Sequence, residues 1–287
     1  MGVFPGFGGW INQNTQRPLK AEHKRSENVE SKAVSEKDNT APAKEENVYY
    51  DIDHVRKQDQ LWHDAEKKHP WYDPPPIVKV TTENGLCHMK IELIVGMSPD
   101  AVYDVMTDPQ SGPFFDVDKW RQIMENKSVK VLKEDGPRQI AKVRKSVAWD
   151  FLWWSIPIPI NLIVDENKIN LTTKYKKEQM MFLKVFEGNY KVEPLYVDSE
   201  RFCKQRLPKS REEYKRCSGG QGKVASKVTI NQYFKPNPLF NLPPVSWYIR
   251  GITIKTTKTL FLLVQHYGTR IRRAGRSQIG QDIKQET

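Results

Sequence analysis

The sequence predicts an α+β domain of long antiparallel strands and one long C-terminal helix, preceded by a largely disordered extension. Apolar residues alternate with polar ones along most segments between residues 77 and 234. Short turn sequences separate most of these segments, which favours an antiparallel sheet over βαβ units. Apolar residues then recur at three- and four-residue steps near the C-terminus, which is typical of a helix.

The N-terminal part has a different composition. Residues 12 to 47 contain almost no large apolar side chain. Such a segment buries too little surface to offset the entropy of ordering, so we expect disorder. A short helix is expected within residues 48 to 69, and PWYDPPP at 70 to 76 forms a stiff boundary. The expected organisation is an extension over 1–76, a folded domain over 77–273 and a disordered tail over 274–287.

Within the domain, turn residues divide the strands. Asn84-Gly85 joins IVKVTT to LCHMKIELIV, and Gly136-Pro137 joins SVKVLKED to QIAKVRKSVAWDFLWWS. Residues 98 to 108 are expected to form a short helix that starts at Ser98 and Pro99, and a second is expected from about 113 to 122. Further strands are KINLTTKYKKE, MFLKVFEGNYKVEPLYV and KVASKVTINQYF, with a polar excursion at 198 to 222 before the last of them.

The segment from Pro243 to Gly275 fits two interpretations. ITIKTTKT alternates and is rich in β-branched residues, as a strand would be. A helical stripe also runs through the segment, and its length of roughly 25 residues is too great for an ordinary strand. Length therefore favours a helix. Its stripe would be Ile249, Ile252, Thr256, Leu260, Leu263, Tyr267 and Ile271.

The stretch VAWDFLWWSIPIPINLIV at 147 to 164 is unusually apolar. A membrane span needs roughly 20 predominantly apolar residues, whereas Asp150 and two prolines interrupt this one. Two strands fit better. Their apolar parity changes between Trp153 and Ile156, which requires a bulge, corner or tight turn near Trp154-Ser155.

Charge is unevenly distributed. The whole chain carries a net +11, of which residues 1 to 73 contribute −2 and residues 74 to 287 contribute +13. A basic domain suggests an anionic partner, either nucleic acid or an acidic membrane surface, although a merely solvated basic surface would have the same charge. No nucleic-acid-binding motif is recognisable, so nucleic acid is the less favoured partner.

Cysteine content bears on the compartment. The sequence has three cysteines, Cys87, Cys203 and Cys217, and no secretory signal is visible. We therefore expect reduced thiols in an intracellular setting, the cytoplasm first, with plastid and nucleus left open. No histidine lies near Cys203 and Cys217 and no metal or cofactor signature is present, so none is expected.

Several strings match a known family. FLWW at 151–154, FEGNYKVEPLYVD at 186–198, REEYKRCSGGQG at 211–222 and SWYIRGITIKTT at 246–257, with the opening GVFPGFGGWINQNTQ, resemble a plant family of START-like proteins. These belong to the helix-grip superfamily, which includes polyketide cyclases and lipid-transfer proteins. The resemblance implies a curved antiparallel sheet wrapped around the C-terminal helix. It also implies a cavity between them that holds a hydrophobic small molecule, without indicating which one.

The candidate site residues follow from this expectation. Large aromatics usually fill a core, but as a group they would also make a cavity suited to a lipid-like ligand. The arginines that close the final helix either complement its dipole or contact an anionic membrane surface. The expected surface contacts are Arg270, Arg272, Arg273 and Arg276. The expected cavity wall is Trp149, Phe151, Trp153, Ile158, Phe182, Tyr233, Trp247, Ile252 and Leu260.

The favoured function is non-enzymatic binding or transfer of a hydrophobic ligand, with peripheral contact to anionic membranes. A cyclase- or hydrolase-type enzyme that uses the same cavity is the alternative, with His88 and Asp150 as candidate proton donors or acceptors. His88 has no evident partner in the sequence, so we expect an ordinary strand residue. Asp150 has the opposite parity to Trp149 and Phe151, so we expect it to point to solvent. A third interpretation is an interaction module that uses GVFPGFGGW as a docking peptide.

Overall fold

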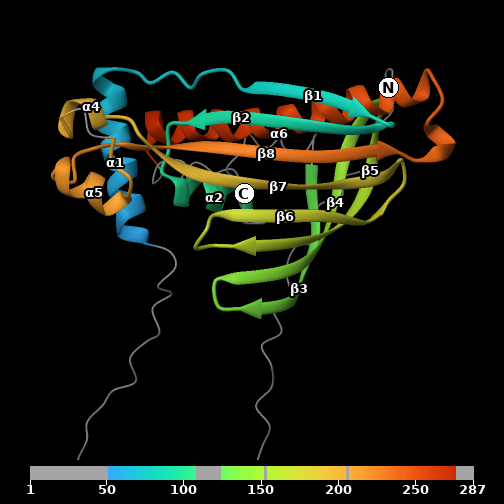
Figure 1. The fold of residues 1–287 in the computed structure, drawn as a ribbon, viewed down its shortest axis with the longest axis horizontal. Coiled ribbons are helices and arrows are strands. Elements are labelled where there is room, and N and C mark those ends of the chain that lie inside the picture. Colours follow the sequence, from blue (N-terminus) through green and yellow to red (C-terminus); the bar gives the residue numbers. More distant parts are fainter. Residues whose placement is uncertain (1–50, 108–123, 152–153, 205–206, 276–287) are drawn as a thin grey trace, which may run out of the picture. The chain divides into compact units, whose positions relative to one another are not determined.

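An eight-stranded antiparallel sheet is the body of the protein (Figure 1) in the computed structural model, which describes residues 51–107, 124–151, 154–204 and 207–275. The strand order is β1-β2-β8-β7-β6-β5-β4-β3, so the last strand lies beside the first hairpin. This architecture confirms the predicted α+β class. The strands are β1 (Ile77–Glu83), β2 (Leu86–Val95), β3 (Met124–Asp135), β4 (Arg138–Phe151), β5 (Trp154–Asn167), β6 (Thr172–Met180), β7 (Leu183–Tyr196) and β8 (Val224–Pro236).

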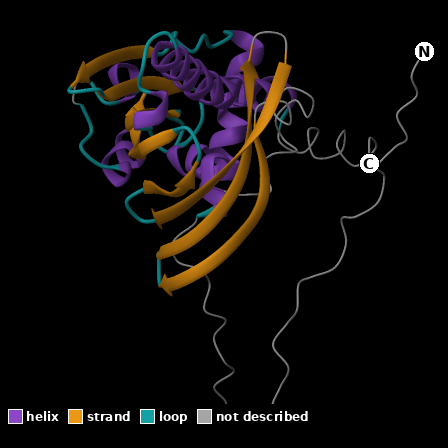
Figure 2. Ribbon diagram, turned by 90° about the vertical axis from the view of Figure 1, so that its right-hand side faces the viewer, coloured by secondary structure: helices purple, strands orange, loops and turns teal. Residues whose placement is uncertain are grey.

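Helices lie on the concave side of this curved sheet (Figure 2). The longest is α6 (Val245–Ala274), whose 30 residues confirm the helical interpretation of the C-terminal segment. We call the sheet face that packs against α6 the inner face. On β2 the residues Cys87, Met89, Ile91, Leu93 and Val95 point to it and are buried. The other helices are α1 (Ile52–Lys68), α2 (Pro99–Thr107), α4 (Ser199–Phe202), α5 (Arg211–Cys217) and the short 3₁₀ helix η2 (Pro238–Phe240).

The turns form where the sequence places them. Asn84 and Gly85 have φ angles of 49° and 77° between β1 and β2, and Gly136 has a φ of 55° between β3 and β4. These left-handed conformations suit Asn and Gly. Helix α2 coincides with the helix expected at 98 to 108, whereas the helix expected at about 113 to 122 lies outside the described residues.

The tryptophan-rich stretch forms two paired strands, as expected. Trp149 pairs with Ile156 and Phe151 pairs with Trp154, so the chain reverses slightly earlier than Trp154-Ser155. Pro157 and Pro159 are exposed, and β6 pairs with β5 only from Ile160 onward. The prolines therefore occupy a part of β5 that has a single hydrogen-bonded neighbour, where a missing N–H is tolerated.

Helix α1 packs against the domain through one face. Its buried residues Val55, Gln58, Trp62 and Glu66 recur at steps of three and four. The Gln58 side chain accepts a hydrogen bond from the Val224 backbone N–H at 2.8 Å and donates one to a backbone carbonyl at 3.2 Å. Helix α1 belongs to the same compact unit as the sheet. The expectation of a largely disordered extension over 1–76 therefore does not hold for residues 51 to 76.

The cysteines also differ from expectation. Cys203 and Cys217 form a disulfide, with Cα atoms 5.1 Å apart, and Cys87 is a buried free thiol. The disulfide joins the two short helices α4 and α5, and Cys203 packs with Tyr214 and Val224 in a small separate core. The expectation of three reduced thiols was therefore wrong. The sequence could not reveal that the polar excursion folds back on itself.

Candidate functional site

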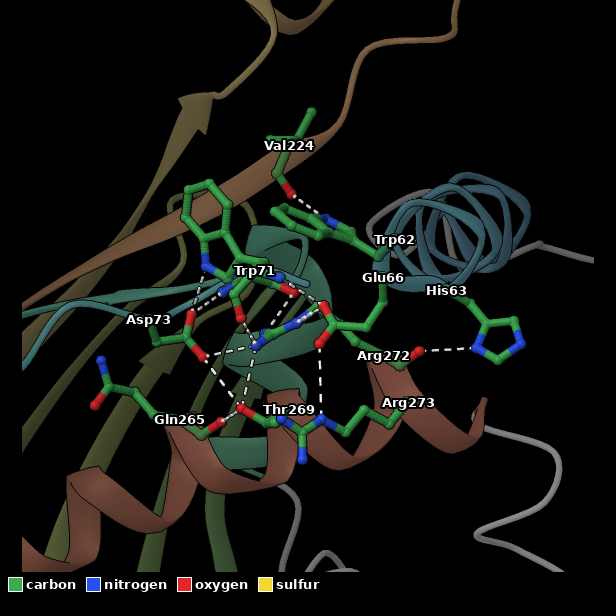
Figure 3. A network of polar contacts seen from close by, with 11 residues as sticks. Trp62, His63, Glu66, Trp71, Asp73, Val224, Gln265, Thr269, Arg272 and Arg273 are labelled. Carbon is green, nitrogen blue, oxygen red and sulfur yellow. Dashed lines mark hydrogen bonds and ion pairs between the residues drawn. The ribbon is translucent and has the colours of Figure 1, made fainter. Parts of the chain in front are cut away.

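Arg272 does not form the surface contact that the sequence suggested. Its side chain is wholly buried in the last turn of α6 (Figure 3). The guanidinium donates to the Glu66 carboxylate at 3.2 Å and to the Asp73 carboxylate at 3.0 Å, and it also donates to the Gly96 carbonyl at 3.2 Å. Arg272 is therefore a structural residue. The physical reason is that two acids far upstream in the sequence neutralise it.

The same carboxylates hold the chain between α1 and β1. Glu66 accepts from the Trp71 backbone N–H at 3.0 Å, and Asp73 accepts from the Trp71 indole at 2.9 Å and from the Gly96 N–H at 2.7 Å. This network fixes the C-terminal half of α6 against α1 and β2. Of the other three arginines, Arg273 has a side chain that is 66% exposed, Arg270 is half-buried and Arg276 lies outside the described residues.

A row of polar residues crosses the apolar inner face. Tyr175 on β6 is opposite Gly188 on β7, which is opposite Gln232 on β8. The Tyr175 hydroxyl donates to the Gln232 side-chain carbonyl at 2.9 Å, and the Gln232 amide donates to the Thr257 hydroxyl of α6 at 3.1 Å. Burial raises the pKa of Tyr175, so its phenol stays protonated. The row links the middle of the sheet to the middle of the helix.

Gly188 makes this row geometrically feasible. A Cβ at this position would lie 2.6 Å from the Tyr175 hydroxyl oxygen and 2.5 Å from the Asn231 carbonyl. Because glycine has no side chain, the Tyr175 ring can lie across β7 and reach β8. The glycine of FEGNYKV is therefore required by the close approach of another side chain.

A second polar cluster lies beside α2. The Tyr103 hydroxyl donates to the Thr172 carbonyl at 2.9 Å and lies 3.0 Å from the Thr173 hydroxyl. Tyr190 on β7 packs nearby, with its ring centre 6.2 Å from that of Tyr103. Burial raises the pKa of Tyr103 to about 12 and holds that of Tyr190 well above its ordinary value, so both phenols are neutral hydrogen-bonding groups.

Two ionisable side chains also share the inner parity of their strands. Lys145 alternates with the buried Val143 and Val147 on β4, and Glu166 follows the buried Val164 on β5. Burial lowers the pKa of Lys145, and the charge of Glu166 opposes this effect. Burial raises the pKa of Glu166, which Lys168 and then Lys145 oppose. The inner face thus carries an amine and a carboxyl that are both shifted toward their neutral forms.

Helix α6 packs unevenly along its length. Its first half has buried Ile249, Ile252 and Thr253, and its second half has a buried run from Leu263 to Gln265. Between them, residues 258 to 262 contain no buried residue, and Leu260 is only half-buried. Of the other expected wall residues, Ile158 lies in the core and Phe182 packs against it, with its ring centre 5.3 Å from that of Phe240. The middle of α6 is therefore less buried than its two halves on either side.

Two expected wall residues lie elsewhere. Tyr233 is on the outer face, where it stacks on His88 at 4.5 Å between ring centres and borders an open hollow with charged walls. The buried parity of β8 is that of Gln232 and Phe234. Trp247 is 66% exposed because it shares a helix face with Gly251 and Lys255, away from the sheet. Both assignments to the cavity wall were wrong.

The remaining candidates are only partly described. His88 lies on the outer face, and its Nε2 is 3.3 Å from the Asn231 side-chain oxygen, so it does not enter the interior. The side chains of Trp149, Asp150 and Phe151, and the whole of Trp153, lie outside the described part of the chain. Within that part, no cluster of three His, Cys, Asp or Glu residues could hold a metal ion, and no helix is long and apolar enough to cross a membrane.

The sequence reasoning missed the residues that give the interior its polarity. Tyr175, Gln232 and Lys145 were not singled out, because the search for a cavity wall selected large apolar and aromatic side chains. A signal existed for Gln232, since KVTINQYF has Val228, Ile230 and Phe234 at its parity. No local signal marks Gly188, because its role depends on a residue of the neighbouring strand.

A curved antiparallel sheet around a long C-terminal helix defines the class as a START-like, helix-grip domain. The model of the family described as "Domain of unknown function DUF220" matches residues 77–274, so the chain belongs to this family. No curated protein matches the chain.

Solved structures with similar folds cover most of the domain at low identity. The Zhui aromatase/cyclase from Streptomyces sp. R1128 is 12% identical with a TM-score of 0.43, covering 67% of this chain and 98% of its own. A START superfamily protein from Mycobacterium smegmatis is 10% identical with a TM-score of 0.40, covering 64% and 98%. The lipid transfer and protein localization domain of human StarD13 (DLC2) is 12% identical with a TM-score of 0.36, covering 74% and 94%.

Proposed function

We propose that this domain binds a hydrophobic small molecule between the inner face of the sheet and the middle of α6, without converting it chemically. The observation that carries the proposal is the polar row Tyr175–Gln232–Thr257, set in a mostly apolar interior beside the partly buried middle of α6. Apolar walls with a few fixed polar groups are typical of small-molecule sites. The ligand would be largely apolar, with a polar group that meets this row.

Native mass spectrometry of the full chain purified from its host tests the proposal. We expect an apolar adduct that organic extraction releases. Leu260→Trp should displace it because residue 260 is half-buried on the middle of α6, whereas Leu262→Trp should retain it because Leu262 is exposed. The proposal is wrong if the folded wild-type protein carries no adduct and also fails to bind an apolar fluorescent probe. Equal retention by both variants would also contradict it.

A specific observation favours an enzyme of the cyclase or hydrolase type as the second candidate. Lys145 and Glu166 lie on the inner parity of neighbouring strands, and their pKa values shift in opposite directions. An amine and a carboxyl shifted toward neutrality can serve as general base and general acid. Lys145 and Glu166 are therefore the candidate proton donor and acceptor in place of His88, because His88 lies on the outer face of the sheet.

The two candidates differ in what the variants do to the ligand. If the protein is a carrier, Lys145→Met and Glu166→Gln change affinity, and the extracted molecule is the same as in the wild type. If it is an enzyme, the variants accumulate a different molecule from the wild type, because the substrate is no longer converted. Mass analysis of the extracts distinguishes these outcomes.

A further inference from the structure

Large apolar side chains are exposed together at the end of the sheet where α6 begins. Leu239 is 83% exposed, Leu242 71% and Trp247 66%. Met181, in the turn between β6 and β7, is 59% exposed. Single exposed apolar residues are ordinary, but a group at one end of a domain indicates an interaction surface. We call Met181, Leu239, Leu242 and Trp247 the tip.

The residues of the tip belong to one structural region. The first residue of β7, Leu183, pairs with Pro236 at the end of β8. The Asn237 backbone N–H donates to the Phe182 carbonyl at 2.9 Å, which joins the β6–β7 turn to the segment before α6. Phe182 and Phe240 also contact each other through their rings. The turn of Met181 and the segment of Leu239 and Leu242 are therefore neighbours.

The segment before α6 is ordered, although it exposes its leucines. Phe240 packs against the core, and its N–H donates to the Asn237 carbonyl at 2.8 Å within η2. The Ser246 N–H donates to the Leu242 carbonyl at 3.0 Å. The backbone thus holds Leu239 and Leu242 outward. Their exposure is a property of a fixed conformation.

Basic residues surround the tip. The sequence contains no Asp or Glu between Glu213 and Asp282, so α6 and the segment before it carry no acid. Lys255 and Lys258 are exposed on the same helix face as Trp247, and the Lys235 amine donates to the Asn84 carbonyl at 2.9 Å at the β1–β2 turn. The same turn is preceded by the exposed acid Glu83. An apolar protrusion with cations behind it suits an acidic bilayer, where apolar side chains enter and ammonium groups meet the headgroups.

We propose that the tip docks the protein on an anionic lipid bilayer. Leu239, Leu242 and Trp247 enter the boundary between headgroups and acyl chains, and Lys255 and Lys258 lie at headgroup level. Trp is enriched at this depth, and each nearby Lys contributes attraction to anionic lipid. This surface is at the start of α6, about 35–40 Å along the helix from the arginines that the sequence suggested. The inference goes beyond the proposed function, because it does not depend on what the interior holds.

Co-sedimentation of the full chain with vesicles tests the proposal. One set is phosphatidylcholine alone, and the other contains about one third phosphatidylserine. We expect binding to the anionic set. The variant Leu239→Ser/Leu242→Ser should bind at least about tenfold more weakly, because it removes the inserted apolar area. Lys255→Glu/Lys258→Glu should weaken binding by about fivefold or more per residue and reduce its salt dependence.

Ile169→Ser is the matched control. Ile169 is 58% exposed in the turn between β5 and β6, at the other end of β6 from Met181. This variant should bind anionic vesicles as the wild type does, and all variants should keep the wild-type unfolding midpoint. The proposal is overturned if the wild type binds neither vesicle set, or if Leu239→Ser/Leu242→Ser binds the anionic vesicles as tightly as Ile169→Ser does. It is equally overturned if the tip mediates self-association or protein binding in place of vesicle binding.

Discussion

The guanidinium of Arg272, in the last turn of α6, donates to the carboxylate of Glu66 on α1 at 3.2 Å, and both side chains are buried. The two residues are 206 positions apart in the sequence. Asp73 contacts the same guanidinium at 3.0 Å, so one cation joins the end of α6 to two acids at and just after the end of α1. This contact makes α1 part of the fold and explains why the helix end is not a free basic surface.

Replacing Arg272 should destabilise the protein strongly. Arg272→Ala leaves two buried carboxylates without their cation, and breaking a buried pair in this way costs about 3–5 kcal/mol. Arg272→Lys should rescue only part of this loss, because an ammonium cannot reach all the acceptors of the guanidinium. Urea unfolding of the full chain measures the free energy of unfolding.

Arg273→Ala is the control for this prediction. Its side chain is 66% exposed and lies 3.7 Å from Glu66, so its removal should change the free energy of unfolding by less than about 1 kcal/mol. A loss for Arg272→Ala no larger than that for Arg273→Ala would show that the buried network does not hold α1 in place.

The interior hydrogen bond of Tyr175 gives a second prediction. Tyr175→Phe leaves the Gln232 side-chain oxygen without its donor, which should cost about 1–3 kcal/mol in the free energy of unfolding. Tyr233→Phe, on the outer face of the next-but-one strand, should cost less than about 0.5 kcal/mol. Chemical denaturation of both variants checks the difference. Equal effects would mean that the row does not stabilise the interior.

The fold could be predicted from the sequence because its signals are local. Strand alternation, as in LCHMKIELIV, and the three- and four-residue steps of α6 depend only on neighbours along the chain. Asn84-Gly85 and Gly136 mark turns for the same reason. The resemblance of several short sequence strings to a START-like family further predicted that the sheet wraps around the C-terminal helix.

The site could be predicted only in part, because it depends on contacts between distant segments. The arginine run at 270 to 276 suggests an exposed basic end, and nothing near it in the sequence shows that Glu66 and Asp73 neutralise Arg272. Tyr233 was preferred over Gln232 because an aromatic suits an apolar wall, yet the parity of Ile230 and Phe234 places Gln232 inside. The choice by side-chain type was therefore wrong, whereas the alternation of apolar residues along β8 identified the inward-facing residue.

Two adjacent acids on β5 should affect stability with opposite pH dependence. Burial raises the folded pKa of Glu166, so its charged form is disfavoured in the fold and stability falls as pH rises through that pKa. Glu166→Gln should therefore be more stable than the wild type at neutral pH, with no difference below the unfolded value near 4.5. Urea unfolding between acid and neutral pH measures this.

Asp165 provides the opposite case. Its hydrogen bonds from Arg138, at 2.8 and 2.7 Å, lower the pKa of its carboxyl. A lowered folded pKa contributes stability above the unfolded value, and this stability is lost as pH falls. Asp165→Asn should therefore be less stable than the wild type at neutral pH, and the gap should close in acid. If both variants shift stability in the same direction, the assignment of the two acids to different environments is wrong.

Gly188 provides the sharpest test of the interior, because a single methyl group should disturb it. In Gly188→Ala the added Cβ would lie 2.5 Å from the Asn231 carbonyl and 2.6 Å from the Tyr175 hydroxyl oxygen, so Tyr175 must move away from Gln232. Overpacking of this kind costs about 1–3 kcal/mol. Gly251→Ala is the matched control, since its Cβ meets nothing within 4 Å on α6.

Alanine has a higher helix propensity than glycine, so Gly251→Ala should stabilise the protein by about 0.5–1 kcal/mol. The thermal unfolding midpoint should therefore fall below that of the wild type in Gly188→Ala and rise above it in Gly251→Ala. Native mass spectrometry adds a second readout, because displacing Tyr175 should also reduce the retained ligand in Gly188→Ala and leave it unchanged in Gly251→Ala. If Gly188→Ala is as stable as the wild type and keeps its ligand, Tyr175 does not need the space over Gly188, and the polar row is not what shapes the site.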